Sequence, residues 1–533
     1  MYSLGLEFST QSVKALIIDV NQARVIFMRA FNYGRFFPDY GTVGGVLPSD
    51  DESRRHTSPL MLIEALDLVF HQLKEDGIDL SLIQAIKVDA MQHCTVYVNG
   101  QFKRIIGSLN PDTRLCEQFA TCFSRSSSPI WEDRSTAREA AILANALSEK
   151  TDIASLTGNL AELRFPAVQI MKWGKEMPDD YAATERIFLL SAFMTSILTG
   201  RICPVDTGDG WGTNMNNLNI VRPGWCGDVL STIEDYIGRR GHGNTLGEKM
   251  GAMDHYDAPA GVVSPCFVEK YGLPANGIVL TGTGDNPATL LGCGGAVVIS
   301  LGSSYTVNGV MDRPVPSASG EYNVFGYTKG RAMALSVITN GAKVHDSFIS
   351  KYILQGADRT PSPAEWDVYM AAAGTSILSP DEPLLLPYLL DESVPLRGKG
   401  MIRSGFPEDK AAINIRALHV SQALSLRLHS SHVSGVASIC LAGSGSQNNF
   451  IKQLLADSFQ AEVYSIDDAD YAAPLGCAIS GARVLLDISY EEAAERFVCR
   501  SESSSCRPLR ENKDTIALLL SRYERLESEN QQH

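Results

Sequence analysis

The 533-residue chain lacks the cysteine and hydrophobic patterns of secreted or membrane proteins. Its eleven cysteines are scattered, with no C-x-x-C pair and no Cys/His cluster at zinc spacing, so neither a disulfide framework nor a structural metal site is expected. No apolar run approaches the ~18 residues that cross a bilayer, and the N-terminus has no signal-peptide pattern. We therefore expect reduced thiols, no membrane partner and a cytoplasmic location.

Positive charge is also scarce. Lys and Arg number 46 and Asp and Glu 61, which gives a formal net charge of −15, and no run of basic residues is long enough to bind nucleic acid or anionic lipid. We therefore expect no nucleic-acid partner, although a small phosphorylated ligand could still bind through backbone N–H groups. Hydrophobic residues make up 44% of the chain, the ordinary content of a folded protein.

Several common enzyme signatures are missing. The chain has no G-x-x-x-x-G-K-[ST] loop and no G-x-G-x-x-G after a strand, so it lacks the fingerprints of Walker-type NTPases and of Rossmann dinucleotide sites. It also has no H-E-x-x-H and no G-x-S-x-G motif. It does contain short turns, rich in Gly, Ser and Thr, that directly follow apolar strands.

Two of these turns belong to a repeated pattern. Residues 2–19 form an apolar strand, a Ser/Thr-rich turn and a second apolar strand, a pattern typical of a β-hairpin. Residues 296–312 repeat it, with Ser9 falling on Ser303 at an offset of 294 residues. The repeat implies two related half-molecules.

The rest of the chain alternates between helical and strand patterns. Apolar residues at helical spacing occupy 59–74 and 415–432, and short apolar strands such as 278–281 lie between such helices, which predicts α/β domains. At roughly 100–200 residues per domain the length predicts at least two. The aperiodic segment 241–259 leads to the expected boundary. We expect an N-terminal domain over 1–275 and a C-terminal domain over 276–533.

Two further Gly-rich turns follow strands, at 281–288 and 441–448. Glycine lets the backbone approach a ligand closely, and successive N–H groups in such turns bind anions. One such turn alone is more often an ordinary connection between a strand and a helix. Four in one chain, two of them related by a repeat, favour a nucleotide held between two halves.

Six motifs in sequence order resemble those of the FGGY carbohydrate kinases. They are GLEFSTQS (5–12), MQHCT (91–95), SPIWEDRST (128–136), GTGDNPA (282–288), SLGSSYT (300–306) and GSGSQN (443–448). Within that family the chain is most similar to the xylulokinases, especially the eukaryotic-type branch. The resemblance implies an α/β fold of two actin-like ATPase (ribonuclease H-like) domains around a central cleft, with ATP on one side and a sugar on the other.

The resemblance implies that Asp285 is the catalytic base. The residue follows a strand in a Gly-rich turn, where a carboxylate can reach a hydroxyl that attacks the γ-phosphate. The alternative is a helix N-cap, which the following Asn-Pro-Ala also suits.

The resemblance also implies a set of sugar contacts. They are Gln92, His93, Asp133, Arg164, Asp285 and Asn286. The plainer alternatives are a core or surface histidine at His93 and a surface ion pair between Glu162 and Arg164.

On the nucleotide side, the resemblance points to the two hairpin turns, an adenosine loop and one tryptophan. These residues are Ser9, Thr10, Gln11, Gly302, Ser303, Ser304, Trp366, Gly443, Ser444, Gly445 and Asn448. Trp366 could equally be a buried core residue, because its flanking residues differ from the family pattern.

One departure from the family pattern concerns a metal. Where the family usually has Asp, this chain has Glu7, whose carboxylate would help to hold Mg²⁺ near the phosphates of ATP. Mg²⁺ requires near-ideal octahedral geometry at ~2.0–2.1 Å, so the extra methylene could displace the ion.

The resemblance implies phosphorylation of D-xylulose to D-xylulose 5-phosphate by ATP. The alternatives are a kinase for another ketose or polyol, such as ribulose or erythritol, and a catalytically weakened protein that only binds sugar or nucleotide. Many members of the family are dimers, so a homodimer is one expected state.

Overall fold

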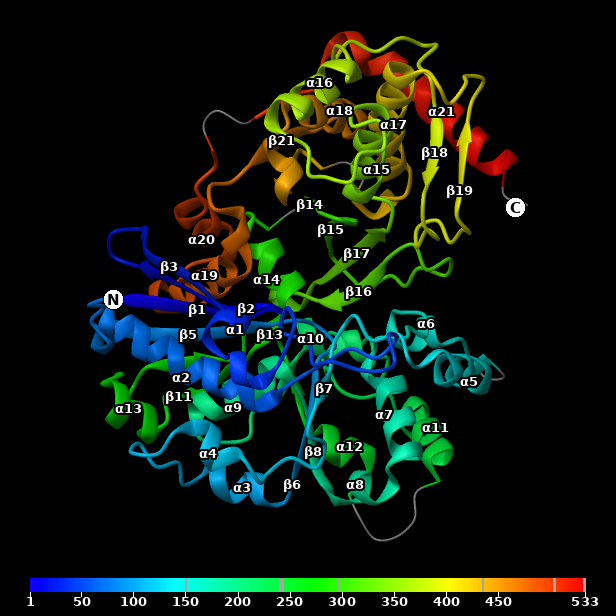
Figure 1. Ribbon diagram of the computed structural model, residues 1–533. Coiled ribbons are helices and arrows are strands. Elements are labelled where there is room, and N and C mark those ends of the chain that lie inside the picture. Colours follow the sequence, from blue (N-terminus) through cyan, green and yellow to red (C-terminus); the bar gives the residue numbers. More distant parts are fainter. Residues whose placement is uncertain (149–150, 239–243, 296, 434–435, 502–504, 531–533) are drawn as a thin grey trace.

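The computed structural model describes residues 1–148, 151–238, 244–295, 297–433, 436–501 and 505–530 (Figure 1). Residue 296, at the start of the predicted second hairpin, and residues 241–243 of the predicted boundary segment lie outside this description. All eleven cysteines are free thiols.

The first sheet has seven strands and contains the first predicted hairpin. Their order is β11 (Pro259–Val262), β12 (Ile278–Leu280), β5 (Ile83–Ala90), β1 (Tyr2–Phe8), β2 (Ser12–Asp19) and β3 (Arg24–Asn32), with β13 (Thr283–Gly284) also paired to β5. The β1–β2 pair is antiparallel and the β1–β5 pair is parallel. Strands β12 and β13 follow the expected boundary at residues 275/276 but join this first sheet, and the boundary itself stays a prediction.

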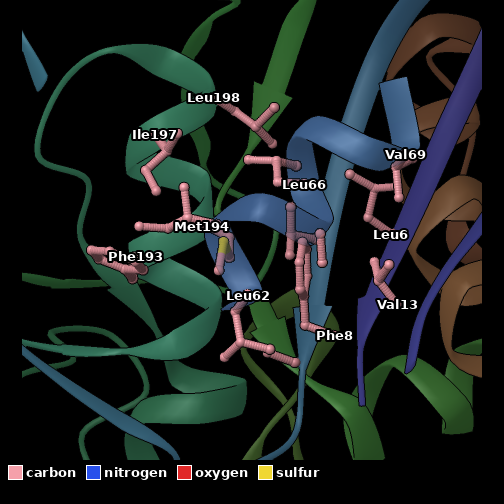
Figure 2. Packing of buried hydrophobic residues seen from close by; sticks show 14 of the residues in the cluster. Leu6, Phe8, Val13, Leu62, Leu66, Val69, Phe193, Met194, Ile197 and Leu198 are labelled. Carbon is pink, nitrogen blue, oxygen red and sulfur yellow. The ribbon is translucent and has the colours of Figure 1, made fainter. Parts of the chain in front are cut away.

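One face of the first sheet packs against α2 (Pro59–Glu75) and α9 (Leu190–Thr199). Phe8 of β1 lies close to Leu62 of α2, and residues of α9 such as Met194 pack on the far side of α2 from the hairpin (Figure 2). Burying a side chain of this size contributes about 1.5–3 kcal/mol. Because side chains alternate along a strand, residues 3, 5 and 7 point to the opposite face.

The opposite face packs against α14 (Asp285–Gly292) and α19 (Ala472–Leu486), which also contact each other (Figure 1). Gly5 allows α19 to approach, because a Cβ there would lie 1.9 Å from the carbonyl oxygen of Pro474. The two helices thus lie closely against the first sheet, on the side that faces the second half of the molecule.

The second sheet repeats the order of the first. Its strands are β16 (Asn323–Gly326), β17 (Ala332–Ile338), β15 (Tyr305–Met311), β14 (Val297–Leu301), β20 (Ser438–Ala442) and β21 (Glu462–Ser465). The order β17-β15-β14-β20-β21 has the same strand directions as β3-β2-β1-β5-β12, with an antiparallel hairpin followed by parallel neighbours. The predicted repeat is therefore confirmed in the described strands.

Helices and short strands surround the second sheet. They are α15 (Ala342–Tyr352), α16 (Pro363–Ala373), β18 (Leu385–Tyr388), β19 (Gly400–Arg403), α17 (Ala411–Leu428), α18 (Asn449–Phe459), α20 (Tyr490–Phe497) and α21 (Lys513–Glu529). Within the described residues, no single helix is both long and apolar enough to cross a membrane. Among the same residues, one bent pair of helices, 469–486 with 490–497, meets the length and composition criteria only when the two are taken together. This pair includes α19, most of whose residues are buried.

Most of the remaining helices and strands of the first half lie below the first sheet in Figure 1, whereas α10 also contacts β16 of the second sheet. The remaining elements are α1 (Tyr33–Phe36), β4 (His56–Thr57), β6 (Thr95–Asn99), α3 (Gln101–Ile106), α4 (Leu115–Phe119), β7 (Ser128–Pro129), α5 (Ala137–Ser148), α6 (Ile153–Thr157), α7 (Pro166–Glu176), α8 (Pro178–Ala183), β8 (Thr184–Leu189), β9 (Val205–Asp206), α10 (Thr207–Gly210), α11 (Gly227–Ile237), α12 (Leu246–Met250), β10 (Met253–Asp254) and α13 (Pro265–Tyr271).

Candidate active site

The candidate site lies where β1, β5 and β13 end beside the first turn of α14. In the strand register, Glu7 is opposite Asp89, and Asp89 is opposite Thr283. Asp285 opens α14 directly after β13. The parallel strands therefore bring three carboxylates from distant parts of the chain to one edge of the sheet.

Asp285 has the electrostatics of a general base. Burial and the negative charge of Glu7 raise its pKa from 3.8 to about 7, although backbone N–H groups of Asn286 and Gln92 partly offset the rise. A general base works best when its pKa is near the operating pH.

Three of the predicted sugar residues form one hydrogen-bonded network. The Asn286 side-chain amide donates to Gln92 Oε1 at 2.7 Å and to Asp285 Oδ1 at 3.0 Å. The Gln92 amide in turn donates to the carbonyl of Gly208 in α10 at 3.1 Å. The network fixes the side-chain orientations next to the base.

His93 lies next to this network, with its ring orientation fixed by the fold. Its ring stacks on Phe165 at 4.3 Å, and Nδ1 lies 2.8 Å from the carbonyl oxygen of Gly212. Because a carbonyl only accepts, Nδ1 carries the proton and Nε2 is left as an acceptor. Burial, with a contribution from the positive charge of Arg164, lowers the pKa of His93 to about 3, so the ring is neutral.

Arg164 faces the same region. Its charge acts on His93, and its buried Nε has no hydrogen-bond partner within the described residues. The alternative ion pair with Glu162 is not found in the described part of the chain.

Asp133 is placed differently from the other predicted sugar residues. It is fully buried and accepts hydrogen bonds from the backbone of Arg55, from the backbone and hydroxyl of Ser135 and from the Gln169 amide, at 2.7–3.0 Å. Burial acts against ionisation, but the His56 ring, whose Nε2 lies 3.4 Å from Oδ2, and the hydrogen bonds from Ser135 outweigh it and lower the pKa of Asp133 well below its ordinary value. These donors occupy its oxygens, so a direct sugar contact stays a prediction.

The first hairpin turn consists of Ser9, Thr10 and Gln11. The Ser9 backbone N–H donates to the carbonyl of Ser12 at 3.0 Å, which closes the turn. The Trp131 indole donates to the Thr10 hydroxyl at 3.0 Å and connects the turn to the sugar side.

The second hairpin turn consists of Gly302, Ser303 and Ser304, between β14 and β15. The Ala342 backbone N–H donates to the carbonyl of Gly302 at 3.1 Å, which brings the start of α15 to this turn. Gly443 also packs here, because a Cβ on it would lie 2.9 Å from the carbonyl of Leu301. The predicted second phosphate turn and adenosine loop are therefore adjacent.

Asn448 and Trp366 lie on adjoining elements. Asn448 caps α18 by accepting from the backbone of Ile451 at 3.2 Å, and its amide nitrogen lies 3.1 Å from Met370 Sδ on α16. Trp366, one turn earlier on α16, is 37% exposed, so the alternative of a buried core tryptophan is wrong. Gly445 belongs to the same loop as Asn448, whereas the side chain of Ser444 lies outside the described part.

The sequence did not point to two charged residues of the site, Lys14 and Asp89. Lys14 is opposite Glu7 in the β1–β2 register, pairs with its carboxylate at 3.0 Å and donates to the carbonyl of Asp470 at 2.8 Å. The signal available in the sequence was a charged residue in a largely apolar strand, two residues from a family motif: 5–12 for Lys14 and 91–95 for Asp89.

The residues around Glu7 fit a divalent cation. Glu7 is 7% exposed, and burial raises its pKa against the opposing effect of Lys14, whose ammonium lies 3.0 Å from Oε2. Mg²⁺ takes oxygen ligands and is often held by one or two carboxylates plus substrate phosphates. Among the described residues, no group of three or more His, Cys, Asp or Glu side chains could hold a metal ion.

Comparison with known proteins identifies the family. The model of the FGGY family of carbohydrate kinases, C-terminal domain, matches residues 297–485. The xylulose kinase of Rattus norvegicus is 31% identical over 483 residues, which cover 88% of this chain and 86% of that protein. The chain belongs to the FGGY family of carbohydrate kinases. Xylulose kinase 2 of Arabidopsis thaliana is 29% identical over 509 residues, 90% of this chain and 86% of that protein.

Solved structures of this family share the fold. A xylulose kinase of Lactobacillus acidophilus superimposes with a TM-score of 0.78 at 16% identity, covering 99% of this chain and 98% of that chain. A xylulose kinase of Rhodospirillum rubrum gives a TM-score of 0.77 at 16% identity over 99% of both chains. The predicted α/β fold of two actin-like domains is confirmed, and membership of the family makes a sugar and ATP the substrates.

Proposed function

We propose that this chain is a xylulokinase, which transfers the γ-phosphoryl group of ATP to the terminal hydroxyl of D-xylulose and releases ADP and D-xylulose 5-phosphate. The observation that carries the proposal is Asp285. Its pKa of about 7 and its hydrogen bond from Asn286 suit a base next to a bound sugar. Relatives named xylulose kinase over most of the chain support the choice of sugar.

In the proposed reaction Asp285 accepts the proton of the terminal hydroxyl. The hydroxyl oxygen forms a bond to the γ-phosphorus while the bond from that phosphorus to the bridging oxygen of ADP breaks. ADP leaves with the electron pair of that bond, and the proton stays on Asp285 until the product departs. A positioned base of this kind contributes typically ~10²–10⁴-fold in rate.

The sugar is oriented by groups on either side of the base. Gln92 and Asn286 hold each other and can present their remaining polar atoms to sugar hydroxyls. His93 Nε2 accepts from a hydroxyl, and the Arg164 guanidinium donates to a hydroxyl or carbonyl oxygen of the ketose. Fixed groups of this kind lower the entropic cost of reaching the reactive geometry.

The nucleotide occupies the other side. The backbone N–H groups of 9–11 and 302–304 bind phosphates, and the base of ATP lies between Trp366 and the loop containing Gly443, Gly445 and Asn448. Glu7 would hold Mg²⁺, which would neutralise phosphate charge when bound, and the ammonium of Lys14 adds a positive charge at the same place. A cytoplasmic location, a homodimer and the division at residues 275/276 stay predictions.

A second candidate function follows from the Glu7–Lys14 ion pair at 3.0 Å. If Lys14 kept the carboxylate from the metal, the protein would bind sugar or nucleotide without turnover. The two functions differ in coupled ADP release from Mg-ATP with D-xylulose, D-ribulose, L-xylulose, L-ribulose, erythritol, glycerol and no sugar. Selective turnover with D-xylulose supports the proposed kinase, whereas nucleotide binding without turnover on any sugar supports the second candidate.

A further inference from the structure

Asp89 is a buried carboxylate that the proposed reaction does not use. It lies on β5 directly opposite Glu7 of β1 in the parallel register. Neighbouring strands are ~4.8 Å apart, and residues in register point to the same face, so the two carboxylates are neighbours. Asp89 has no exposed surface.

The hydrogen bonds of Asp89 leave it poorly satisfied. Its Oδ2 accepts only from the Cys477 thiol, a weak donor, at 3.3 Å. Its Oδ1 has no hydrogen-bond partner within the described residues. Asp133, equally buried, accepts from four donors. Since buried polar groups are nearly always paired, the free oxygen of Asp89 points to a partner that the polypeptide does not supply.

The positive side chains near Asp89 do not neutralise its carboxylate. The carboxylates of Glu7 and Asp285 add negative charge near Asp89. Lys14 is paired with Glu7. Lys87, on the same face of β5 two residues before Asp89, donates instead to the carbonyls of Tyr256 and Thr281 at 2.8 and 2.7 Å. A cation between Glu7 and Asp89 would supply the missing charge.

We propose that Asp89 is a second protein ligand of the divalent cation, binding it with Glu7 either directly or through one water. The inference rests on the proposed function, since phosphates of ATP and water supply the other oxygens of the ion. It explains why a carboxylate with a free oxygen lies opposite Glu7, two residues before the first hairpin turn begins. It also gives Glu7, which pairs with Lys14 in the structure, a second carboxylate, Asp89, with which to hold the ion.

The test measures metal binding separately from turnover. Free Mn²⁺ is titrated by electron paramagnetic resonance in the presence of protein and a non-hydrolysable ATP analogue. We expect Asp89→Asn and Glu7→Gln each to weaken Mn²⁺ binding about 10–100-fold, the usual range for groups that support a metal. If both contact one ion, the double variant should bind less weakly than the product of the two single effects predicts.

Cys477→Ala is the matched control, because it removes the thiol donor of Asp89 and keeps the carboxylate. We expect its Mn²⁺ affinity to stay within about twofold of wild type. Unchanged affinity in a folded Asp89→Asn protein would overturn the inference, as would an equal loss in Cys477→Ala, which would indicate that Asp89 only anchors α19.

Two further measurements cover other outcomes. If Asp89→Asn does not fold, anomalous diffraction from wild-type crystals with Mn²⁺ and the analogue locates the ion, and an ion too far from Asp89 for direct or one-water contact overturns the inference. Wild-type protein that binds Mn²⁺ and nucleotide as expected but phosphorylates no sugar would contradict the proposed function and leave the metal inference supported.

Discussion

Replacing Asp285 by Asn should separate catalysis from stability. The variant keeps the size of the side chain but cannot accept the hydroxyl proton. The loss of a general base predicts a fall in kcat of about 10²–10⁴-fold, or roughly 3–5 kcal/mol in the barrier.

The same substitution should stabilise the fold. A carboxyl whose pKa rises from 3.8 in the unfolded chain to about 7 in the folded protein is destabilising when ionised. The free-energy cost to folding grows as the pH rises from 3.8 to about 7 and is constant at higher pH. At 1.36 kcal/mol per pKa unit this cost is at most about 4 kcal/mol at pH 8, and the uncharged Asn side chain removes it. Asn also keeps a polar group at the start of α14.

The assay pairs coupled ADP release with thermal unfolding, both at pH 8. The control is Asp19→Asn at the far end of β2, where the carboxylate accepts from two backbone N–H groups of a turn. We expect wild-type turnover in Asp19→Asn, and in Asp285→Asn a large loss of turnover with a melting temperature equal to or above wild type. Retention of more than about a tenth of wild-type turnover, or a clear drop in melting temperature, would refute the reasoning.

Three other changes give sharp expectations. The value of kcat/KM for D-xylulose should fall about tenfold per pH unit below about pH 7, because protonated Asp285 cannot act as a base. A flat profile of kcat/KM from pH 5 to 8 would exclude Asp285 as the titrating group. Trp366→Ala should raise the KM for ATP about tenfold or more and leave the KM for the sugar unchanged, because stacking on a nucleotide base contributes about 1–3 kcal/mol. Steady-state kinetics in which both KM values moved together would reject the assignment of Trp366 to the nucleotide. Gly5→Ala should lower the free energy of unfolding in urea by about 2 kcal/mol or more, because the new Cβ would meet Pro474 of α19. Gly100→Ala, where a Cβ has nothing within 4 Å, should change this free energy little. Equal effects of the two substitutions would contradict the packing argument.

The sequence predicted the features that depend on local pattern. The helical periodicity at 59–74 became α2, with a proline in its first turn after the Ser58 cap. The strand expected at 278–281 formed at Ile278–Leu280, whereas the segment expected to be a turn, 281–288, contains the short strand β13 and the first residues of α14. The helix expected at 415–432 occupies Ala411–Leu428 instead, because the Ala-rich start extends it and the polar end does not continue it.

Features that depend on strand register could not be predicted. Glu7 and Asp89 are 82 residues apart, and only the parallel pairing of β1 with β5 makes them neighbours. Burial was equally hidden: Asp133 is enclosed by donors from three separate segments, and Trp366 is exposed because its helix lies at the surface. Local patterns identify chemical groups, whereas long-range pairing decides which of them meet.

The most direct test of the central claim is the position of the transferred phosphate. D-xylulose labelled with ¹³C at carbon 5 is incubated with Mg-ATP and the protein, and the products are observed by ³¹P NMR. The account predicts a phosphomonoester signal split by the labelled carbon, formed in equal amount to ADP. Inorganic phosphate in place of the ester, or an ester without the splitting, would contradict it.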